Sequence, residues 1–257
     1  MTEEEWRSDS ELDRLIRLKG FSSEMSLRHI SAGWDLNARL IHVNGFSSER
    51  RLRLFNAACS SQIVHLLSEP AKAALDAQER FADGLCSKQL LDELHDLEYA
   101  ATMEAYPDGY THSNAWYANQ AASICSASSY LRYAESNLAE SSCWYKAAGY
   151  VAIGLKNLNS PHSQESDWRS KLELLQFLRD IFGNPFRPVS FDREWRTSTV
   201  VAIAKAMYES RDFSPMPILG DALQDAGCDH EEILTHCRSD GPHVKGCWVV
   251  DLVLGKE

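Results

Sequence analysis

Residues 14–28, RLIRLKGFSSEMSLR, align with residues 39–53, RLIHVNGFSSERRLR, at an offset of 25 positions. The shared centre of the two copies is Gly-Phe-Ser-Ser-Glu. Glycine adopts the left-handed conformation that ends a helix, serine caps the next helix, and a glutamate in the first turn is favoured by the helix dipole. Each copy therefore predicts a helix, a tight turn and a second helix, over residues 14–31 and 39–56.

The rest of the chain also favours helices. Apolar residues recur at intervals of three and four along most of it, and alternation with a period of two is scarce. The two clearest stripes are Leu52, Phe55, Cys59, Ile63 and Leu66, and then Leu90, Leu94, Leu97, Ala101 and Ala105. These patterns predict an all-α protein, a multi-helical bundle or repeat-like array of helical hairpins.

Capping and turn residues divide the C-terminal part of the chain into short helices. The expected helices are one that Thr197 and Ser198 open and that ends near Ser210, one from Pro215 to Ala226, and a short one capped by Asp229. Residues 244–254 are ambiguous, because their valines favour a strand whereas other apolar residues recur at helical spacing. We interpret them as a helix, since no second strand is evident to pair with them.

The domain organisation follows from one linker. Residues 157–164, which include Pro161, form the clearest break between helical patterns. The sequence therefore predicts an N-terminal helical region over 1–156, containing the tandem repeat, and a C-terminal helical region over 165–257. The two regions can also form one continuous globule.

Charge is unevenly distributed along the 257 residues. The net charge is −11, which argues against a general binder of nucleic acid or anionic membranes, because phosphate contacts require a surplus of Lys and Arg. Residues 14–56 nevertheless hold eight basic and three acidic residues, a net +5, between acidic stretches on either side. This basic segment predicts a surface for another protein, and an acidic partner would suit it.

The candidate protein-binding residues in that segment are Arg14, Arg17, Arg50, Arg51 and Arg53. The alternative interpretation is that the acidic stretches of the same chain neutralise them, or that they form a solvated helix face. A second candidate surface is the stretch 114–156, which is rich in Tyr and Trp, although aromatic residues at helical spacing are more often core.

The lack of a recognisable targeting signal and the number of cysteines both bear on the cellular compartment. The acidic N-terminus is followed by no apolar region typical of a signal peptide, and no run of about 18 apolar residues could cross a bilayer. The seven cysteines are an odd number in a chain long enough to form a core without disulfides. We therefore expect reduced thiols, a cytoplasmic protein and no membrane partner.

The largest group of potential metal ligands lies near the C-terminus, where Cys228, His236, His243 and Cys247 could bind zinc. Their spacing matches no standard zinc finger, and the alternative is that the cysteines pack in the core. A Cys/His nucleophile pair, Cys237 or Cys247 with His243, is the enzymatic interpretation. The sequence contains no phosphate-binding loop and no nucleophile elbow. It therefore nominates no catalytic residue, and a structural zinc is the one cofactor considered.

Two regions resemble a large paralogous family of uncharacterised bacterial helical proteins. The matching motifs are Arg51-Leu52-Arg53-Leu54-Phe55 near the N-terminus and, near the C-terminus, Asp225-Ala226-Gly227-Cys228, His236-Cys237-Arg238 and Pro242-His243-Val244-Lys245-Gly246-Cys247-Trp248-Val249-Val250-Asp251. The resemblance implies membership of this family and supplies no activity or mechanism. The expected function is a non-catalytic protein-interaction or scaffold module. The alternatives are a zinc-stabilised helical domain and a Cys/His-dependent enzyme, and nothing in the sequence indicates an oligomeric state.

Overall fold

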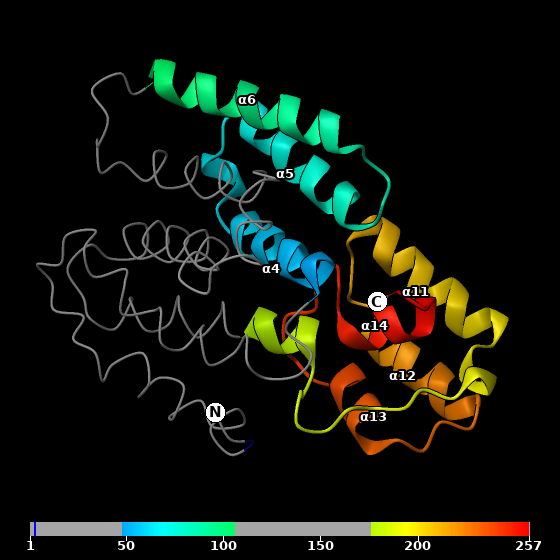
Figure 1. Cartoon of the computed structure of the whole chain (residues 1–257). Helices are drawn as coiled ribbons and strands as arrows, with labels where there is room; N and C mark the ends of the chain where they lie inside the picture. The colour runs from blue at the N-terminus through cyan, green and yellow to red at the C-terminus, as the bar shows by residue number, and fades with distance from the viewer. Residues whose placement is uncertain (1–2, 4–47, 106–175, 257) are drawn as a thin grey trace, which may run out of the picture. The chain divides into compact units, whose positions relative to one another are not determined.

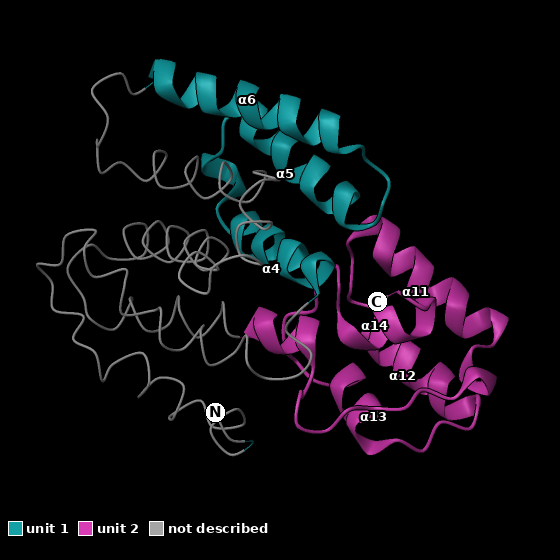
Figure 2. Ribbon diagram, viewed as in Figure 1, with its two compact units in different colours: residues 1–175 teal, residues 176–257 magenta. Residues whose placement is uncertain are grey.

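A computed structural model describes residue 3, residues 48–105 and residues 176–256 (Figure 1). The chain divides into two compact units, Met1–Leu175 and Gln176–Glu257, which Figure 2 colours separately. The first repeat copy, the aromatic stretch 114–156 and the predicted linker 157–164 lie outside the described residues. The described residues are mostly helical and contain no strand, which confirms the predicted all-α class. None of the helices found among them is long and apolar enough to span a membrane.

The described part of the first unit consists of consecutive helices joined by short turns. They are α4 (Glu49–Ser61), the 3-10 helix η2 (Val64–Leu66), α5 (Glu69–Ala82) and α6 (Lys88–Ala105). The hydroxyl of Ser48 accepts a hydrogen bond from the Arg51 backbone N–H, so this serine of the second repeat copy caps α4 as predicted. Ser68 caps α5 in the same way through the N–H of Ala71. Helix α5 packs against both α4 and α6.

The apolar stripe predicted from Leu52 to Leu66, which begins on α4, is largely buried. Phe55, Cys59 and Ile63 belong to the core, whereas Leu52 and Leu66 at its ends are half-buried. The stripe is interrupted, because α4 ends at Ser61 and Ile63 follows in the turn before η2. Helical spacing therefore identified the buried face correctly and placed the end of the helix too late.

The predicted face of α6 is wrong. The structure buries Leu91, Glu98 and Thr102, whereas Leu97 of the predicted stripe is 60% exposed. The hydroxyl of Thr102 donates a 2.9 Å hydrogen bond to the Glu98 carboxylate, so two polar residues share the buried side. Apolar periodicity is misleading here, because hydrogen bonding lets polar residues occupy the interior.

The second unit contains several short helices around one apolar core. Residues 176–182 are helical, and the later elements are the 3-10 helix η3 (Arg193–Trp195), α11 (Ser198–Ser210), α12 (Met216–Asp225), α13 (Glu231–Cys237) and α14 (Trp248–Leu254). Thr197 caps α11 as predicted, through the N–H of Val200. Of the ambiguous C-terminal segment 244–254, Trp248–Leu254 forms a helix as predicted, whereas residues 244–247 lie in the turn before it. The N-cap of α13 is His230, one residue later than the predicted Asp229.

The core of the second unit comes from helices that are distant in sequence. Its fully buried aliphatic members include Val200, Leu219, Leu223, Ile233, Val249 and Val250. Helix α11 packs against α12 and α14, and α12 packs against α13. At the α12–α13 contact, a Cβ on Gly220 would lie only 2.9 Å from the Cβ of Cys237. The missing side chain of Gly220 therefore sets the close approach of these two helices, which fixes α13 in place.

Candidate metal centre

Four side chains of the second unit bring metal-ligating atoms together. Asp180 lies in the helical residues 176–182, His236 in the last turn of α13, His243 in the following loop, and Cys247 directly before α14. One ligand atom from each residue can be chosen so that all four lie within 4.8 Å of one another. The segment between α13 and α14 therefore supplies two of the four residues, His243 and Cys247.

Asp180 is the centre of the cluster. Its Oδ2 accepts a 2.9 Å hydrogen bond from the backbone N–H of Val244. Its Oδ1 lies 2.8 Å from Nδ1 of His243 and 3.1 Å from Nε2 of His236. One carboxylate oxygen is therefore anchored by the backbone, which leaves the other directed at both imidazoles. A carboxylate held in this way is oriented to bind a metal through a single oxygen.

Both Asp180 and Cys247 approach the same nitrogen of His236. Nε2 of His236 lies 3.2 Å from Sγ of Cys247, in addition to its 3.1 Å approach to the carboxylate. The second nitrogen of His243, Nε2, is buried with no hydrogen-bond partner among the described residues. The donor atoms thus converge on a common region instead of forming a linear relay.

The cluster is closed to solvent. The side chains of Asp180 and His243 are 3% and 7% exposed, that of His236 is 17% exposed, and Cys247 is fully buried. An isolated charged carboxylate is costly in such a place unless hydrogen bonds or a cation compensate it. The contacts of Asp180 with Val244, His243 and His236 compensate its charge, and a cation bound at the same place would add to this compensation.

The pKa values at the site reflect burial and mutual contact. Burial by itself would raise the pKa of Asp180, but its hydrogen bonds with His236 and His243 outweigh burial and hold that pKa below its usual range. Burial, and then the charge of Asp180, raise the pKa of the Cys247 thiol well above its ordinary value. The nearby backbone N–H groups of Val250 and Val249 partly oppose this rise by favouring the thiolate. Without a metal, Cys247 therefore remains a protonated thiol beside an ionised carboxylate.

The donor set and its spacing fit a tetrahedral ion. Ligands at ordinary zinc bond lengths lie about 3.3–3.5 Å from one another around a tetrahedron. Three of the contacts, at 2.8, 3.1 and 3.2 Å, are slightly shorter than such edges, and no pair of the four ligand atoms is more than 4.8 Å apart. Modest shifts of side chains would therefore place Asp180, His236, His243 and Cys247 around one ion.

The structure brings together three of the four residues that the sequence nominated as zinc ligands. His236, His243 and Cys247 belong to the cluster, whereas Cys228 is buried in the core outside it. Asp180 takes the fourth position and was missed. The sequence gives little signal for Asp180, because it follows the charged Arg179 and lies 56 positions before His236, although the structure buries it beside Ile181.

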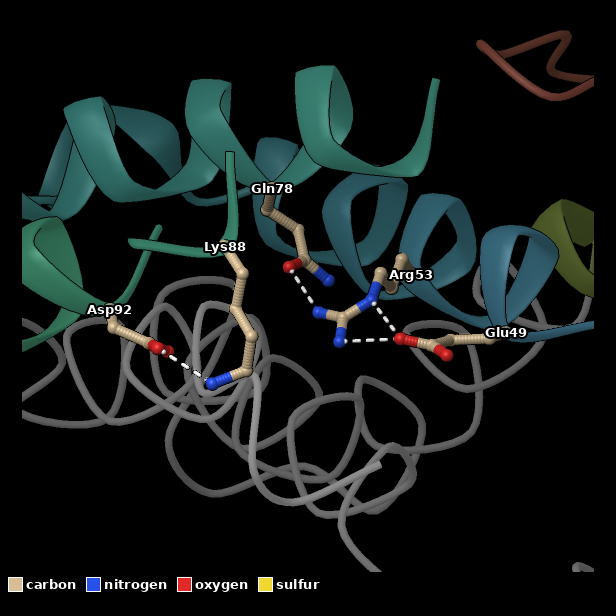
Figure 3. A network of polar contacts seen from close by, with 5 residues as sticks. All are labelled: Glu49, Arg53, Gln78, Lys88 and Asp92. Atoms are coloured by element: carbon tan, nitrogen blue, oxygen red, sulfur yellow. Dashed lines mark hydrogen bonds and ion pairs between the residues drawn. The ribbon is translucent and has the colours of Figure 1, made fainter. Parts of the chain in front are cut away.

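The arginines nominated for protein binding do not form an exposed edge in the described residues. Arg53 is only 1% exposed, and its guanidinium donates hydrogen bonds to Glu49 and Gln78, as Figure 3 shows. It also lies over the ring of Phe81, with 4.8 Å between its Cζ and the ring centroid. The prediction that Arg53 lies on an exposed edge is therefore wrong, because an amphipathic pattern does not reveal that a charge is paired inside the protein.

The neighbouring arginines differ from one another. The side chain of Arg50 is 13% exposed and forms a 3.2 Å ion pair with the buried carboxylate of Asp83. Arg51 is half-buried, and its role in binding stays a prediction. Arg14 and Arg17 lie outside the described residues. Arg50 and Arg53 therefore connect α4 to Asp83 and Gln78, at and near the end of α5.

No protein-family model, curated protein or solved structure matches this chain.

Proposed function

We propose that the second unit is a zinc-stabilised helical module in which Asp180, His236, His243 and Cys247 hold one structural Zn²⁺. The observation that carries this proposal is the convergence of their four ligand atoms within 4.8 Å in a buried place. The ion would tie the helix at 176–182 to the end of α13 and the start of α14.

The chemistry of the donors favours zinc. Two imidazole nitrogens and one sulfur suit Zn²⁺, whereas Mg²⁺ and Ca²⁺ prefer oxygen ligands alone. A carboxylate oxygen is the third kind of ligand that zinc accepts in proteins. Zinc binding would also replace the proton of Cys247, because only the thiolate coordinates the metal.

The arrangement supports a structural role for the ion. Catalytic zinc sites hold three protein ligands and keep one position open for water or substrate. Here four protein side chains converge, and the least buried of them, His236, is 17% exposed. Four protein ligands in a closed site leave little room for a reacting molecule.

The alternative of a Cys/His nucleophile fits the geometry less well. In a nucleophile–base–carboxylate arrangement, the carboxylate holds one imidazole nitrogen while the other accepts the thiol proton. Asp180 and Cys247 instead approach the same nitrogen of His236. The raised pKa of the buried Cys247 thiol also opposes nucleophilic chemistry. We therefore favour the metal over the enzyme.

The test uses cobalt as a spectroscopic substitute for zinc. The full-length protein is freed of metal with a chelator, and Co²⁺ is then added while the absorption spectrum is recorded. The proposal predicts tetrahedral d–d bands and a thiolate-to-cobalt charge-transfer band that saturate at one equivalent and disappear when Zn²⁺ is added. A spectrum of hexahydrated Co²⁺ alone would contradict it.

A further inference from the structure

Trp248 lies directly against the proposed ligands. It is the first residue of α14, follows Cys247 immediately, and is 9% exposed. Its ring centroid lies 5.1 Å from that of His236, with an angle of 54° between the ring planes. A large rigid side chain therefore packs against one ligand and is covalently adjacent to another.

Gly183 lies against the Trp248 ring. It adopts a left-handed conformation with φ +64° and ends the helical residues 176–182, where its N–H donates to the carbonyl of Arg179. A Cβ at this position would lie 3.2 Å from Cγ and 3.3 Å from Cδ2 of Trp248. The indole thus rests on the backbone of the segment that carries Asp180.

The imidazole of His236 is consequently confined by two rings. Trp248 contacts it in a tilted arrangement, and His243 packs edge-on with 4.8 Å between ring centroids. Rotating the His236 ring would require one of these neighbours to move. Its Nε2 is therefore held facing Asp180 and Cys247.

We infer that Trp248, seated on Gly183, is a positioning residue that fixes the His236 imidazole for metal binding, an inference that rests on the proposed function. Trp248 supplies no ligand atom. Its effect is to limit the orientations of His236 and to keep water from the cluster. Groups that orient metal ligands from outside the coordination sphere commonly alter metal affinity about 10–100-fold.

The experiment compares Co²⁺ affinity and spectra of the full-length chain carrying Trp248→Leu, Trp248→Phe or Gly183→Ala. Gly227→Ala is the matched control, because Gly227 lies in the same unit and has φ +90° but nothing within 4 Å of its missing Cβ. Both glycine variants incur backbone strain, whereas only Gly183→Ala crowds Trp248. Each titration is made at a temperature where circular dichroism shows that the metal-free variant is folded.

We expect Trp248→Leu and Gly183→Ala to weaken Co²⁺ binding about 10-fold or more and to shift the d–d bands. Trp248→Phe should restore most of the affinity, and Gly227→Ala should keep the wild-type affinity and spectrum even if its melting temperature falls. Wild-type affinity and spectrum in Gly183→Ala would overturn the inference while leaving the zinc proposal intact. This variant also decides the matter if Trp248→Leu does not fold. Failure of the wild-type protein to bind Co²⁺ would overturn both.

Discussion

Oδ1 of Asp180 lies 2.8 Å from Nδ1 of His243, although 63 positions separate the two residues in the chain. The adjacent residue, Val244, donates its backbone N–H to the other oxygen of the same carboxylate. Asp180 therefore fastens the loop between α13 and α14 to the helix at 176–182 even before a metal is considered. The carboxylate stabilises the loop and at the same time orders the proposed ligands.

Asp180→Asn tests the charge of this carboxylate with little change in shape. We expect zinc affinity to fall at least about 10-fold, because a neutral amide is a poorer ligand and no longer attracts the cation. Competition with a chromophoric chelator measures the affinity. Asp221→Asn is the control, since Asp221 lies in the same unit but is 70% exposed and paired with Arg238 at the surface. Equal affinities in the two variants would remove Asp180 from the metal centre.

Cys247→Ser tests whether sulfur is a ligand. The variant should lose the thiolate-to-cobalt charge-transfer band and bind zinc more weakly, because a serine hydroxyl is a poor substitute for a thiolate ligand. Cys228→Ser offers the matched control, since Cys228 is also buried but lies outside the cluster. It should keep the charge-transfer band even if burial of a hydroxyl lowers its stability. If only Cys228→Ser lost the band, Cys228 and not Cys247 would be the sulfur ligand.

How far the sequence predicts this fold depends on where local signals suffice. The sequence correctly predicts Thr197 and Ser48 as helix N-caps, because capping depends on residues only a few positions apart in the chain. The buried face of α6 could not be predicted in the same way. Glu98 and Thr102 are buried as a hydrogen-bonded pair, and this depends on packing that hydropathy does not record.

In the candidate site, too, the residues close in sequence could be predicted and the distant one could not. Residues 236, 243 and 247 are close in sequence, so their shared chemistry is visible as a cluster of Cys and His. Asp180 is distant from them and reaches the site through tertiary packing, which residue spacing cannot reveal. Conversely, Cys228 is near the cluster in sequence but belongs to the apolar core. Arg53 was misassigned because a paired, buried arginine and an exposed one look alike in sequence.

The pKa of Cys237 predicts loss of stability at alkaline pH. Burial raises that pKa from 9.0 to about 12, so the folded protein keeps a proton that the unfolded chain releases. The resulting stabilisation is complete below pH 9.0 and is lost as the pH rises towards 12, by up to about 1.4 kcal/mol per pH unit. Chelator-treated Cys237→Ala should lose stability less steeply over this range in urea unfolding. Parallel pH profiles for the variant and the wild type would contradict the assignment.

Arg53→Glu tests the corrected view of the basic segment. We expect the free energy of unfolding to fall by about 3–5 kcal/mol, because the change removes one partner of a buried network and places a second carboxylate beside Glu49. Lys72→Glu is the control, since the side chain of Lys72 is 39% exposed and pairs on α5 with that of Glu69, which is 87% exposed. It should change stability by about 1 kcal/mol or less. Comparable unfolding curves for both variants would contradict the buried, paired position of Arg53.

The most direct test of the central claim is the zinc content of the purified protein, followed by its melting temperature with and without a chelator. The account predicts about one zinc per chain and a melting temperature that falls when the chelator removes the ion and recovers when Zn²⁺ is restored. Protein that contains no zinc, takes up none when Zn²⁺ is supplied, and melts at the same temperature in chelator would contradict a zinc-stabilised module.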